Sequence, residues 1–298
     1  MNKTKIEWAD ATWNPVTGCL NDCEYCYARG IARRFGGWDY SSGSVRMNIS
    51  EDKTYICLDT EMFRSWDCKV YEHRGQKIAD LSSAYRISKG RKLVKAPFPF
   101  GFTPTLHRYR LTEPQTWKEP RTVFVCSMAD LFGEWVPDEW ITEVFAACAA
   151  APQHRYLFLT KNPKRYVRLD ESGKLPTKHW YGTTVTTKRD LQFISNAHHT
   201  FISVEPILED FPNGVSCEYL RGLGLPTKGK PKPSVKNTDW IIVGAETGNR
   251  SGKVTPRKEW IDHITQAADE AKIPVFMKDS LIPIVGEENM RRELPWEV

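Results

Sequence analysis

The 298-residue sequence predicts an α/β fold in which parallel strands form a partial or complete (β/α) barrel. Between residues 119 and 279, short apolar runs alternate with segments of helical character. The runs are apolar almost throughout, which is typical of parallel strands covered on both faces. About six or seven such units fit into the chain, which favours a barrel over an open doubly wound sheet. No glycine-rich phosphate-binding motif follows any of these runs, which argues against a nucleotide-binding α/β fold.

Each strand and helix of this fold can be assigned to a segment of the sequence. The first strand is expected within IEWADATW, at residues 6–13. Later strands are expected at 122–127, 155–160, 179–185, 199–206, 239–248 and 273–279. Helices are expected at 138–151, from Asn162-Pro163 onward, over LQFISNA at 191–197, and at 258–271. The active sites of such barrels lie at the carboxyl ends of the strands. The polar residues at these ends are Ser127, Asp130, Thr160, Lys161, Thr183, Thr184, Glu205, Glu246, Lys278 and Asp279.

Two insertions interrupt the alternation of strands and helices. We therefore expect the barrel to comprise residues 1–37 and 101–298, with 38–100 as an insertion or lid that binds substrate. Within that insertion, 54–63 and 68–78 resemble strands. The second insertion, 222–237, has the glycine, proline and lysine content of an exposed loop. Its lysines are suited either to contact phosphates or to form a solvated linker; they are Lys228, Lys230, Lys232 and Lys236.

Composition and charge limit the class of protein. Hydrophobic residues make up 40% and charged residues 27% of the chain, as in soluble globular proteins. The sequence offers neither an apolar run of the ~20 residues that a membrane span requires nor the apolar core of a signal peptide, so we expect a cytoplasmic protein without a membrane partner. Residues 27–110 contain 16 Lys and Arg against 8 Asp and Glu, although the whole chain carries only +5. This local excess indicates either an anionic partner, nucleic acid first among them, or a solvated basic surface.

The most informative motif is a group of three cysteines, Cys19, Cys23 and Cys26, with the spacing C-x3-C-x2-C. Clustered cysteines in a reducing compartment are more often metal ligands or catalytic groups than disulfides. Three thiolates can bind three irons of a 4Fe–4S cluster and leave the fourth iron open to a small molecule. Structural zinc prefers four ligands, so that reading needs a distant fourth such as Cys57, Cys68 or His73. Three unliganded cysteines are the remaining alternative.

The C-x3-C-x-aromatic-C pattern near the N-terminus resembles the radical S-adenosylmethionine (SAM) superfamily. The resemblance implies a partial (β/α)6 barrel, a 4Fe–4S cluster and reductive cleavage of SAM to methionine and a 5′-deoxyadenosyl radical. It also implies an electron donor such as flavodoxin or ferredoxin. The chemistry would belong to the cofactors, while the protein orients and shields the reacting groups.

A closer resemblance is to a family of phage-encoded radical-SAM-like proteins of unknown function, and a weaker one is to spore photoproduct lyase. The stretches that carry the closer resemblance are KIEWADATWNPVTGC, CEYCYA, FVCSMADLFGEWVPDEW, APQHRYLFLTKNPKR, ISVEPIL and IIVGAETG, about two-thirds of the chain. The sequence departs from that family in two places. Its first cysteine spacer is the standard three residues where many relatives have a longer one. In addition, Cys126 stands where relatives are expected to have Asn.

The resemblance and the strand-end positions suggest a role for each candidate SAM-binding residue. Tyr25 would pack against the cluster loop and present its backbone to adenine. SMAD, at 127–130, replaces the Gly-Gly-Glu segment of many superfamily members, so Ser127 and Asp130 would accept from the SAM ammonium. Thr184 and Glu205 are candidates for contacts to the ribose and the methionyl group.

Three further residues are candidates for catalysis. Lys161 would pair with the SAM carboxylate or a substrate phosphate. Glu246 would bind SAM or the substrate. The thiol of Cys126 would donate a hydrogen atom to a product radical, or else Cys126 is simply a small buried strand residue.

The sequence is compatible with three hypotheses for the substrate or partner. The first hypothesis is an enzyme, most simply an isomerase, that remodels a modified thymine during hypermodification of phage DNA in the host cytoplasm. Aromatic residues interleave with the basic residues of 27–110, as in surfaces that stack bases and follow phosphates. The second hypothesis is a radical SAM enzyme acting on a small metabolite, a peptide or RNA, or repairing a thymine lesion. The third is a non-enzymatic iron–sulfur or zinc interaction module.

Overall fold

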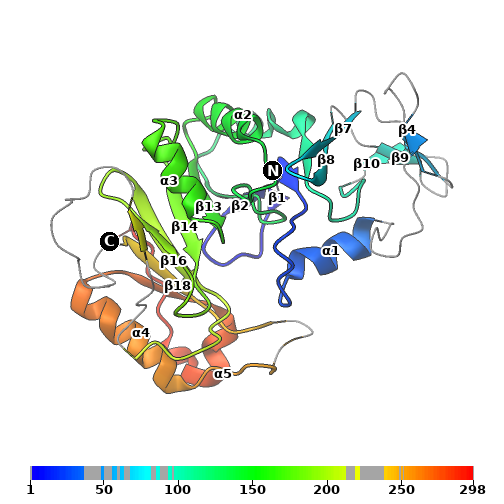
Figure 1. The fold of residues 1–298 in the computed structure, drawn as a ribbon. Coiled ribbons are helices and arrows are strands. Elements are labelled where there is room, and N and C mark those ends of the chain that lie inside the picture. Colours follow the sequence, from blue (N-terminus) through cyan, green and yellow to red (C-terminus); the bar gives the residue numbers. More distant parts are fainter. Residues whose placement is uncertain are drawn as a thin grey trace. The chain divides into compact units, whose positions relative to one another are not determined.

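The computed structural model describes residues 2–36, 68–81, 97–212, 238–247, 250 and 252–297, with the backbone of short strands elsewhere. The chain divides into two compact units. The N-terminal unit comprises residues 1–3 and 11–154, and the C-terminal unit comprises residues 4–10 and 155–298. Figure 1 draws both, coloured along the sequence. The boundaries expected from the sequence, with 38–100 set apart as a substrate-binding lid, stay a prediction.

Three strands of the N-terminal unit pair side by side. β1 (Asn2–Lys3) pairs antiparallel with β2 (Ala11–Trp13), and β2 pairs parallel with β12 (Thr122–Val125). Ala11, Trp13, Val123 and Val125 are buried, as expected for strands within a core. α2 (Asp138–Ala149) buries Trp140, Ile141, Val144, Phe145, Ala147 and Cys148. Their helical spacing explains why 138–151 was correctly predicted as a helix.

A second sheet in this unit has the strand order β3-β11-β8-β7. It consists of β3 (Val16–Thr17), β11 (Thr105–His107), β8 (Gln76–Leu81) and β7 (Cys68–His73). β7 and β8 form a hairpin whose turn, Arg74-Gly75, has positive φ angles of 52° and 75°, as a two-residue type I′ turn requires. β8 pairs parallel with β11. The strand-like segment 68–78 is therefore confirmed as strand.

Further short elements complete the N-terminal unit. α1 (Tyr27–Gly36) follows the cysteine loop directly. β4 (Asn48–Ile49), β5 (Ile56–Leu58) and β6 (Glu61–Phe63) pair antiparallel, as do β9 (Tyr85–Ile87) and β10 (Leu93–Lys95). The 3-10 turns η2 (Arg108–Arg110) and η3 (Glu113–Thr116) lie between β11 and β12. Strand segments are thus confirmed within 54–63, whereas most of 38–67 lies outside the described residues.

The C-terminal unit contains five parallel strands in the order β13-β14-β16-β18-β19. They are β13 (Arg155–Thr160), β14 (Trp180–Thr184), β16 (His199–Val204), β18 (Trp240–Val243) and β19 (Val275–Met277). The helices are α3 (Lys164–Glu171), α4 (Lys258–Ala271) and α5 (Ile282–Val285), with 3-10 turns η6 (Asp279–Leu281) and η7 (Glu287–Asn289). The α/β class with parallel strands is confirmed, while a radical SAM barrel stays a prediction.

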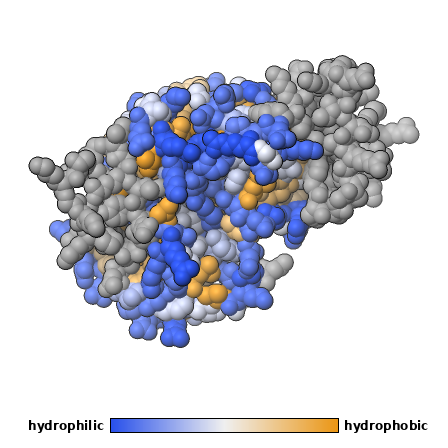
Figure 2. Space-filling model, viewed as in Figure 1, coloured by the Kyte–Doolittle hydropathy of each residue, from blue (hydrophilic) through white to orange (hydrophobic). Residues whose placement is uncertain are grey.

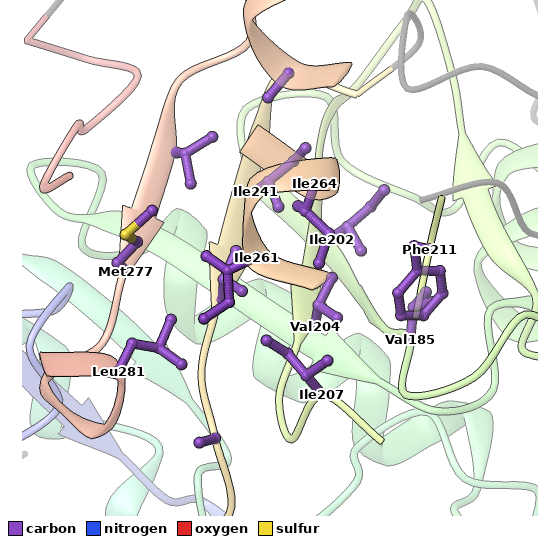
Figure 3. Close-up of a cluster of buried hydrophobic side chains, with 14 of the residues drawn as sticks. Val185, Ile202, Val204, Ile207, Phe211, Ile241, Ile261, Ile264, Met277 and Leu281 are labelled. Atoms are coloured by element: carbon purple, nitrogen blue, oxygen red, sulfur yellow. The ribbon is translucent and has the colours of Figure 1, made fainter. Parts of the chain in front are cut away.

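The core of the C-terminal unit lies between these strands and α4 (Figure 3). Ile261, Ile264 and Ala268 project from one face of α4 at helical spacing and are fully buried. They pack against strand residues that include Ile202, Val204, Ile241, Val243, Val275 and Met277. Burying an aliphatic side chain of this size stabilises the folded state by about 1.5–3 kcal/mol. The packing of α4 therefore stabilises the sheet whose strand ends carry the candidate residues.

One predicted element was wrong. LQFISNA was expected to be a helix, but Gln192–Ile194 forms strand β15, which pairs parallel with β17 (Tyr219–Arg221). The side chains of all three β15 residues are buried, and the Phe193 N–H donates to Thr183 Oγ1 at 3.2 Å. Seven residues are too few for helical periodicity to compete with an aromatic and β-branched run of this kind. The lysine loop 222–237 lies outside the described residues. None of the described helices is long and apolar enough to cross a membrane.

Candidate functional site

The cysteine loop begins at Gly18, where the backbone is clamped between two turns of the N-terminal unit. The Gly18 N–H donates to Met128 O at 2.9 Å, and the Cys19 N–H donates to Phe102 O at 3.1 Å. Gly18 has φ +84°, and a Cβ there would lie 2.2 Å from Thr103 O. Only glycine fits this combination of left-handed backbone and close approach. The start of the loop is therefore fixed by sequence-distant contacts.

The three thiols of the loop form no disulfide and are partly exposed. Backbone amides donate to two of them, from Asn21 to Cys19 Sγ at 3.5 Å and from Arg29 to Cys26 Sγ at 3.4 Å. The pKa of Cys19 is raised to about 12, mainly by burial and next by the carboxylate of Asp130; the Asn21 amide lowers it, and Cys23 and Cys26 raise it. Cys23 and Cys26 thus lie close enough to Cys19 to raise its pKa.

The donor atoms of the cysteine loop are its three thiols. Among the described residues, no three His, Cys, Asp or Glu side chains are gathered as the ligands of one ion. A cubane cluster binds each thiolate at a different iron, so its cysteines stand farther apart than the ligands of one zinc. The side chains of Cys57 and Cys68, considered above as a fourth zinc ligand, lie outside the described residues.

The segment after β12 is fastened to the cysteine loop. Asp130 is buried, and its Oδ2 accepts from Asn21 Nδ2 at 2.9 Å while its Oδ1 accepts from the Phe132 N–H at 3.1 Å. The Tyr27 hydroxyl donates to Ser127 O at 2.7 Å. The structure therefore brings Ser127 and Asp130 together with the cysteines. Both oxygens of the Asp130 carboxylate thus accept hydrogen bonds that fix its orientation.

Two asparagines in this region were not predicted from the sequence. Asn14 Oδ1 accepts from Ser127 Oγ at 3.2 Å and from the Met128 N–H at 3.0 Å. Asn21 joins the loop to Asp130. Their only sequence signal is that they are amides within or just before the cysteine motif, because their partners lie more than a hundred residues away.

Tyr25 and Cys126 have different surroundings. Tyr25 is half-buried within the cysteine loop. Cys126 has φ +60° and is buried, and its pKa is raised to about 12 mainly by burial, while the Val16 amide lowers it. Its thiol influences the pKa of Cys148, on α2, which burial raises well above its ordinary value. Cys126 therefore has a neutral thiol in the interior near α2, and its role as a hydrogen-atom donor stays a prediction.

The remaining candidates stand at the carboxyl ends of the C-terminal strands. Lys161 follows β13, Thr184 ends β14 and Glu205 follows β16. Because neighbouring parallel strands end at the same edge of a sheet, these residues lie along one edge. Lys161 is half-buried and Thr184 is buried. The structure thus gathers Lys161, Thr184 and Glu205 at one edge of this unit.

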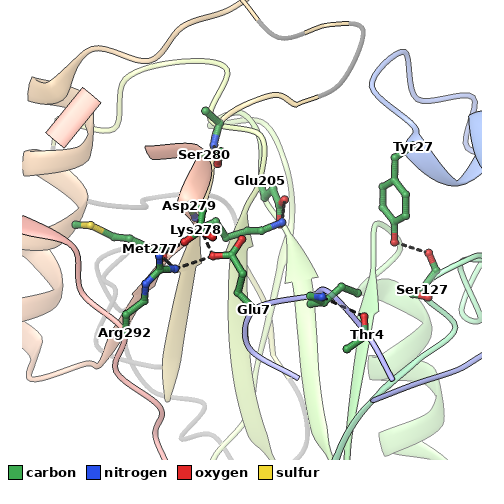
Figure 4. Close-up of polar contacts among 12 residues, drawn as sticks. Thr4, Glu7, Tyr27, Ser127, Glu205, Met277, Lys278, Asp279, Ser280 and Arg292 are labelled. Atoms are coloured by element: carbon green, nitrogen blue, oxygen red, sulfur yellow. Dashed lines mark hydrogen bonds and ion pairs between the residues drawn. The ribbon is translucent and has the colours of Figure 1, made fainter. Parts of the chain in front are cut away.

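The two carboxylates at this edge differ in availability. Glu205 forms an ion pair with Lys278, as Figure 4 shows, and both side chains are partly exposed. A Cβ at Gly244 would lie 3.2 Å from both Glu205 Cγ and Lys278 Cδ, so this glycine leaves room for the pair. Glu246, with only 1% of its side chain exposed, accepts from Arg250 Nε at 2.8 Å and from the Val254 N–H at 3.3 Å. Glu246 therefore fastens the loop after β18, whereas Glu205 is the more accessible group.

These observations define an α/β protein with parallel strands, polar strand ends and a three-cysteine loop before its first helix. The chain belongs to the family described as "Protein of unknown function (DUF5131)", whose family model matches residues 3–69 and 79–281. The match includes the cysteine loop and every strand-end candidate named above. No curated protein and no solved structure gave a significant match to the chain.

Proposed function

We propose that this protein is a radical SAM enzyme whose 4Fe–4S cluster is bound by Cys19, Cys23 and Cys26. The observation that carries the proposal is the cysteine loop, which holds three thiols outside any disulfide, two of which influence the pKa of the third. The loop is held by hydrogen bonds to Phe102 and Met128. A loop that supplies three thiolates would leave one iron of a 4Fe–4S cluster for a small-molecule ligand. When bound, such a cluster supplies the electron that cleaves SAM into methionine and a 5′-deoxyadenosyl radical.

The residues around the loop would orient SAM. Ser127 and Asp130 are candidates because Asn21 and Tyr27 join their segment to the cysteine loop. The buried carboxylate of Asp130 would suit an ammonium, because a charge-assisted hydrogen bond is about twice as strong as a neutral one. Tyr25 remains the candidate for adenine.

The strand-end residues of the C-terminal unit supply the other proposed contacts. Lys161 is the candidate for a carboxylate or phosphate, and Thr184 is the candidate for the ribose. Of the two glutamates, we favour Glu205 for SAM or substrate, since Glu246 already accepts from Arg250 and Val254. Cys126 would act as a hydrogen-atom donor only if its interior thiol is reached by the radical.

For the substrate, we propose a modified thymine or deoxynucleotide of DNA, remodelled by an isomerase-type reaction. The support is the basic character of residues 27–110. This stretch contains 16 Lys and Arg residues against 8 Asp and Glu residues. Neutralising phosphates is the main source of affinity for DNA and makes binding steeply salt-dependent. Radical chemistry can rearrange a group at an unactivated carbon, and remodelling a modified thymine requires such a rearrangement.

The test of the cluster is metal analysis after anaerobic reconstitution with iron and sulfide. Wild type should hold about four irons per chain with matching sulfide. Cys19→Ala, Cys23→Ala and Cys26→Ala should each lose most of that iron, whereas Cys148→Ala should keep it, because Cys148 is a free cysteine buried on α2. Stoichiometric zinc in place of iron, or full iron in all three loop variants, would contradict the proposal.

The substrate is tested by binding to a duplex oligonucleotide over a range of salt concentrations. Several phosphate contacts predict a log–log slope of several units between affinity and salt. A flat salt dependence would redirect the search to a small metabolite or a peptide.

A further inference from the structure

Large apolar side chains are exposed at one place in the described part of the chain. They are Leu20 at 37%, Tyr27 at 55%, Ile31 at 37% and Phe35 at 56% exposure. Leu20 belongs to the cysteine loop, and the other three belong to α1, the helix that begins directly after Cys26. On the face drawn in Figure 2, the coloured residues are mainly hydrophilic, with small separate apolar patches. Exposed apolar side chains that cluster on one element mark an interaction surface.

α1 places its larger apolar side chains outward and its small ones inward. Ala28 and Ala32 are buried against Phe98 and Met128, in a cluster that Cys26 also contacts. Tyr27, Ile31 and Phe35 recur every four residues and therefore share the other apolar face of the helix. A helix that needed only to pack on its own unit would bury these larger side chains instead. Tyr27 bonds to Ser127 O through its hydroxyl, but packing within the unit does not explain the exposure of Ile31 and Phe35.

The charge of this surface has one sign. α1 carries Arg29, Arg33 and Arg34 and has no acidic residue. Arg34 follows Ile31 by three positions and so borders the apolar stripe, and both Arg33 and Arg34 are exposed. Aromatic residues and arginine are the types enriched where proteins meet, and a basic rim selects an acidic partner.

We infer that the apolar stripe of α1 with Arg34, which we call the α1 surface, docks a small acidic electron-transfer protein that reduces the cluster. This inference rests on the proposed function. A carrier seated on α1 would lie next to the cysteine loop, because Cys26 directly precedes the helix and packs in the same cluster as its buried face. Redox encounters also use small, transient interfaces, which a ten-residue helix can provide.

Two features favour a protein over DNA as the occupant. Proteins contact DNA mainly through hydrogen bonds and ion pairs from basic and polar side chains to phosphates. Such contacts would not require the apolar side chains of Ile31 and Phe35 beside Arg34. A protein–protein contact, in contrast, needs a central apolar anchor surrounded by polar groups, which Phe35 and Arg34 provide.

The experiment uses the reconstituted full chain and purified flavodoxin as the probe. Reduced flavodoxin is mixed with the protein without oxygen, and the loss of cluster absorbance gives the rate of electron transfer. Wild type is compared with Arg34→Glu/Phe35→Ser and with the control Lys174→Glu, a charge reversal at an exposed residue after α3. Each protein is also reduced with dithionite, which needs no docking surface. Iron content confirms that all three are equally loaded.

We expect the double variant to accept electrons from flavodoxin at least about tenfold more slowly, as for the loss of an apolar anchor and a rim charge. Its reduction by dithionite and the behaviour of the control should match wild type, and the wild-type rate with flavodoxin should fall with added salt. A double variant that flavodoxin reduces at the wild-type rate would overturn the inference. The inference would also be overturned if the double variant instead lost binding to a duplex oligonucleotide. The same holds if wild type were a dimer and the double variant a monomer. Absence of a cluster in wild type would instead refute the proposed function, and the inference would fall with it.

Discussion

Replacing Gly18 with alanine should be unusually costly, because the backbone there is both left-handed and closely packed. Gly18 has φ +84°, and a Cβ would lie 2.2 Å from Thr103 O and 2.6 Å from Phe102 O. The left-handed backbone alone costs a residue with a Cβ about 1–2 kcal/mol. The clash is with backbone, so the turn must move. The hydrogen bonds from Gly18 and Cys19 to Met128 and Phe102 would then weaken, at about 1 kcal/mol each.

These contributions predict a local destabilisation of about 3–4 kcal/mol for Gly18→Ala. The matched control is Gly252→Ala, since Gly252 has the same φ of +84° with nothing within 4 Å of a Cβ. It should cost only about 1–2 kcal/mol. The two variants together separate the backbone term from the packing term.

The assay is hydrogen exchange measured by mass spectrometry on peptides that span the cysteine loop. A loss of about 3 kcal/mol corresponds to roughly 100-fold faster exchange if the loop opens locally. Reconstituted iron should fall in parallel, because the thiols are no longer held together. If Gly18→Ala exchanges no faster than wild type, or costs no more than Gly252→Ala, the clamped loop described here is wrong.

Three further predictions concern stability, each measured by urea unfolding. Burial lowers the pKa of His179 to about 4 from its ordinary 6.5, so its stabilising effect is complete above pH 6.5 and is lost as the pH falls towards 4. The free energy of unfolding should therefore fall between pH 7.5 and 5 by about 2 kcal/mol less in His179→Phe than in wild type. The same pH dependence in both proteins would contradict this. Arg108→Met should cost about 2–3 kcal/mol by leaving the buried Asp80 unpaired, and adding Asp80→Asn should recover part of it; no recovery would show that the ion pair is not the cause. Ile264→Ala should cost about 3 kcal/mol in the core, against less than about 0.5 kcal/mol for its exposed neighbour in Gln266→Ala, and equal costs would contradict the packing of α4.

Long segments with a single clear period could be predicted from the sequence. The helix at 258–271 and the strand at 155–160 were predicted with their observed bounds. In α4 the apolar positions Ile261, Ile264 and Ala268 mark one helical face over fourteen residues, which leaves little ambiguity. LQFISNA offered only seven residues, and burial of β15 beside β17 decided its conformation instead. Tertiary context overrides local pattern where the pattern is short.

For the candidate site too, local features could be predicted from the sequence and distant contacts could not. The cysteine spacing is local, so it could be recognised directly. The contacts that hold the loop could not, because Gly18 meets Thr103 and Asn14 meets Ser127 across about a hundred residues of chain. Likewise, nothing local distinguishes Glu246 from Glu205 as a strand-end carboxylate, and only the contacts from Arg250 and Val254 reveal that it is occupied.

The most direct test of the central claim is whether the reduced, reconstituted protein converts SAM to 5′-deoxyadenosine. We predict product from wild type and from Cys148→Ala, and none above background from Cys23→Ala. Equal product from wild type and Cys23→Ala, or no product from wild type loaded with iron and sulfide, would contradict the assignment of this protein as a radical SAM enzyme.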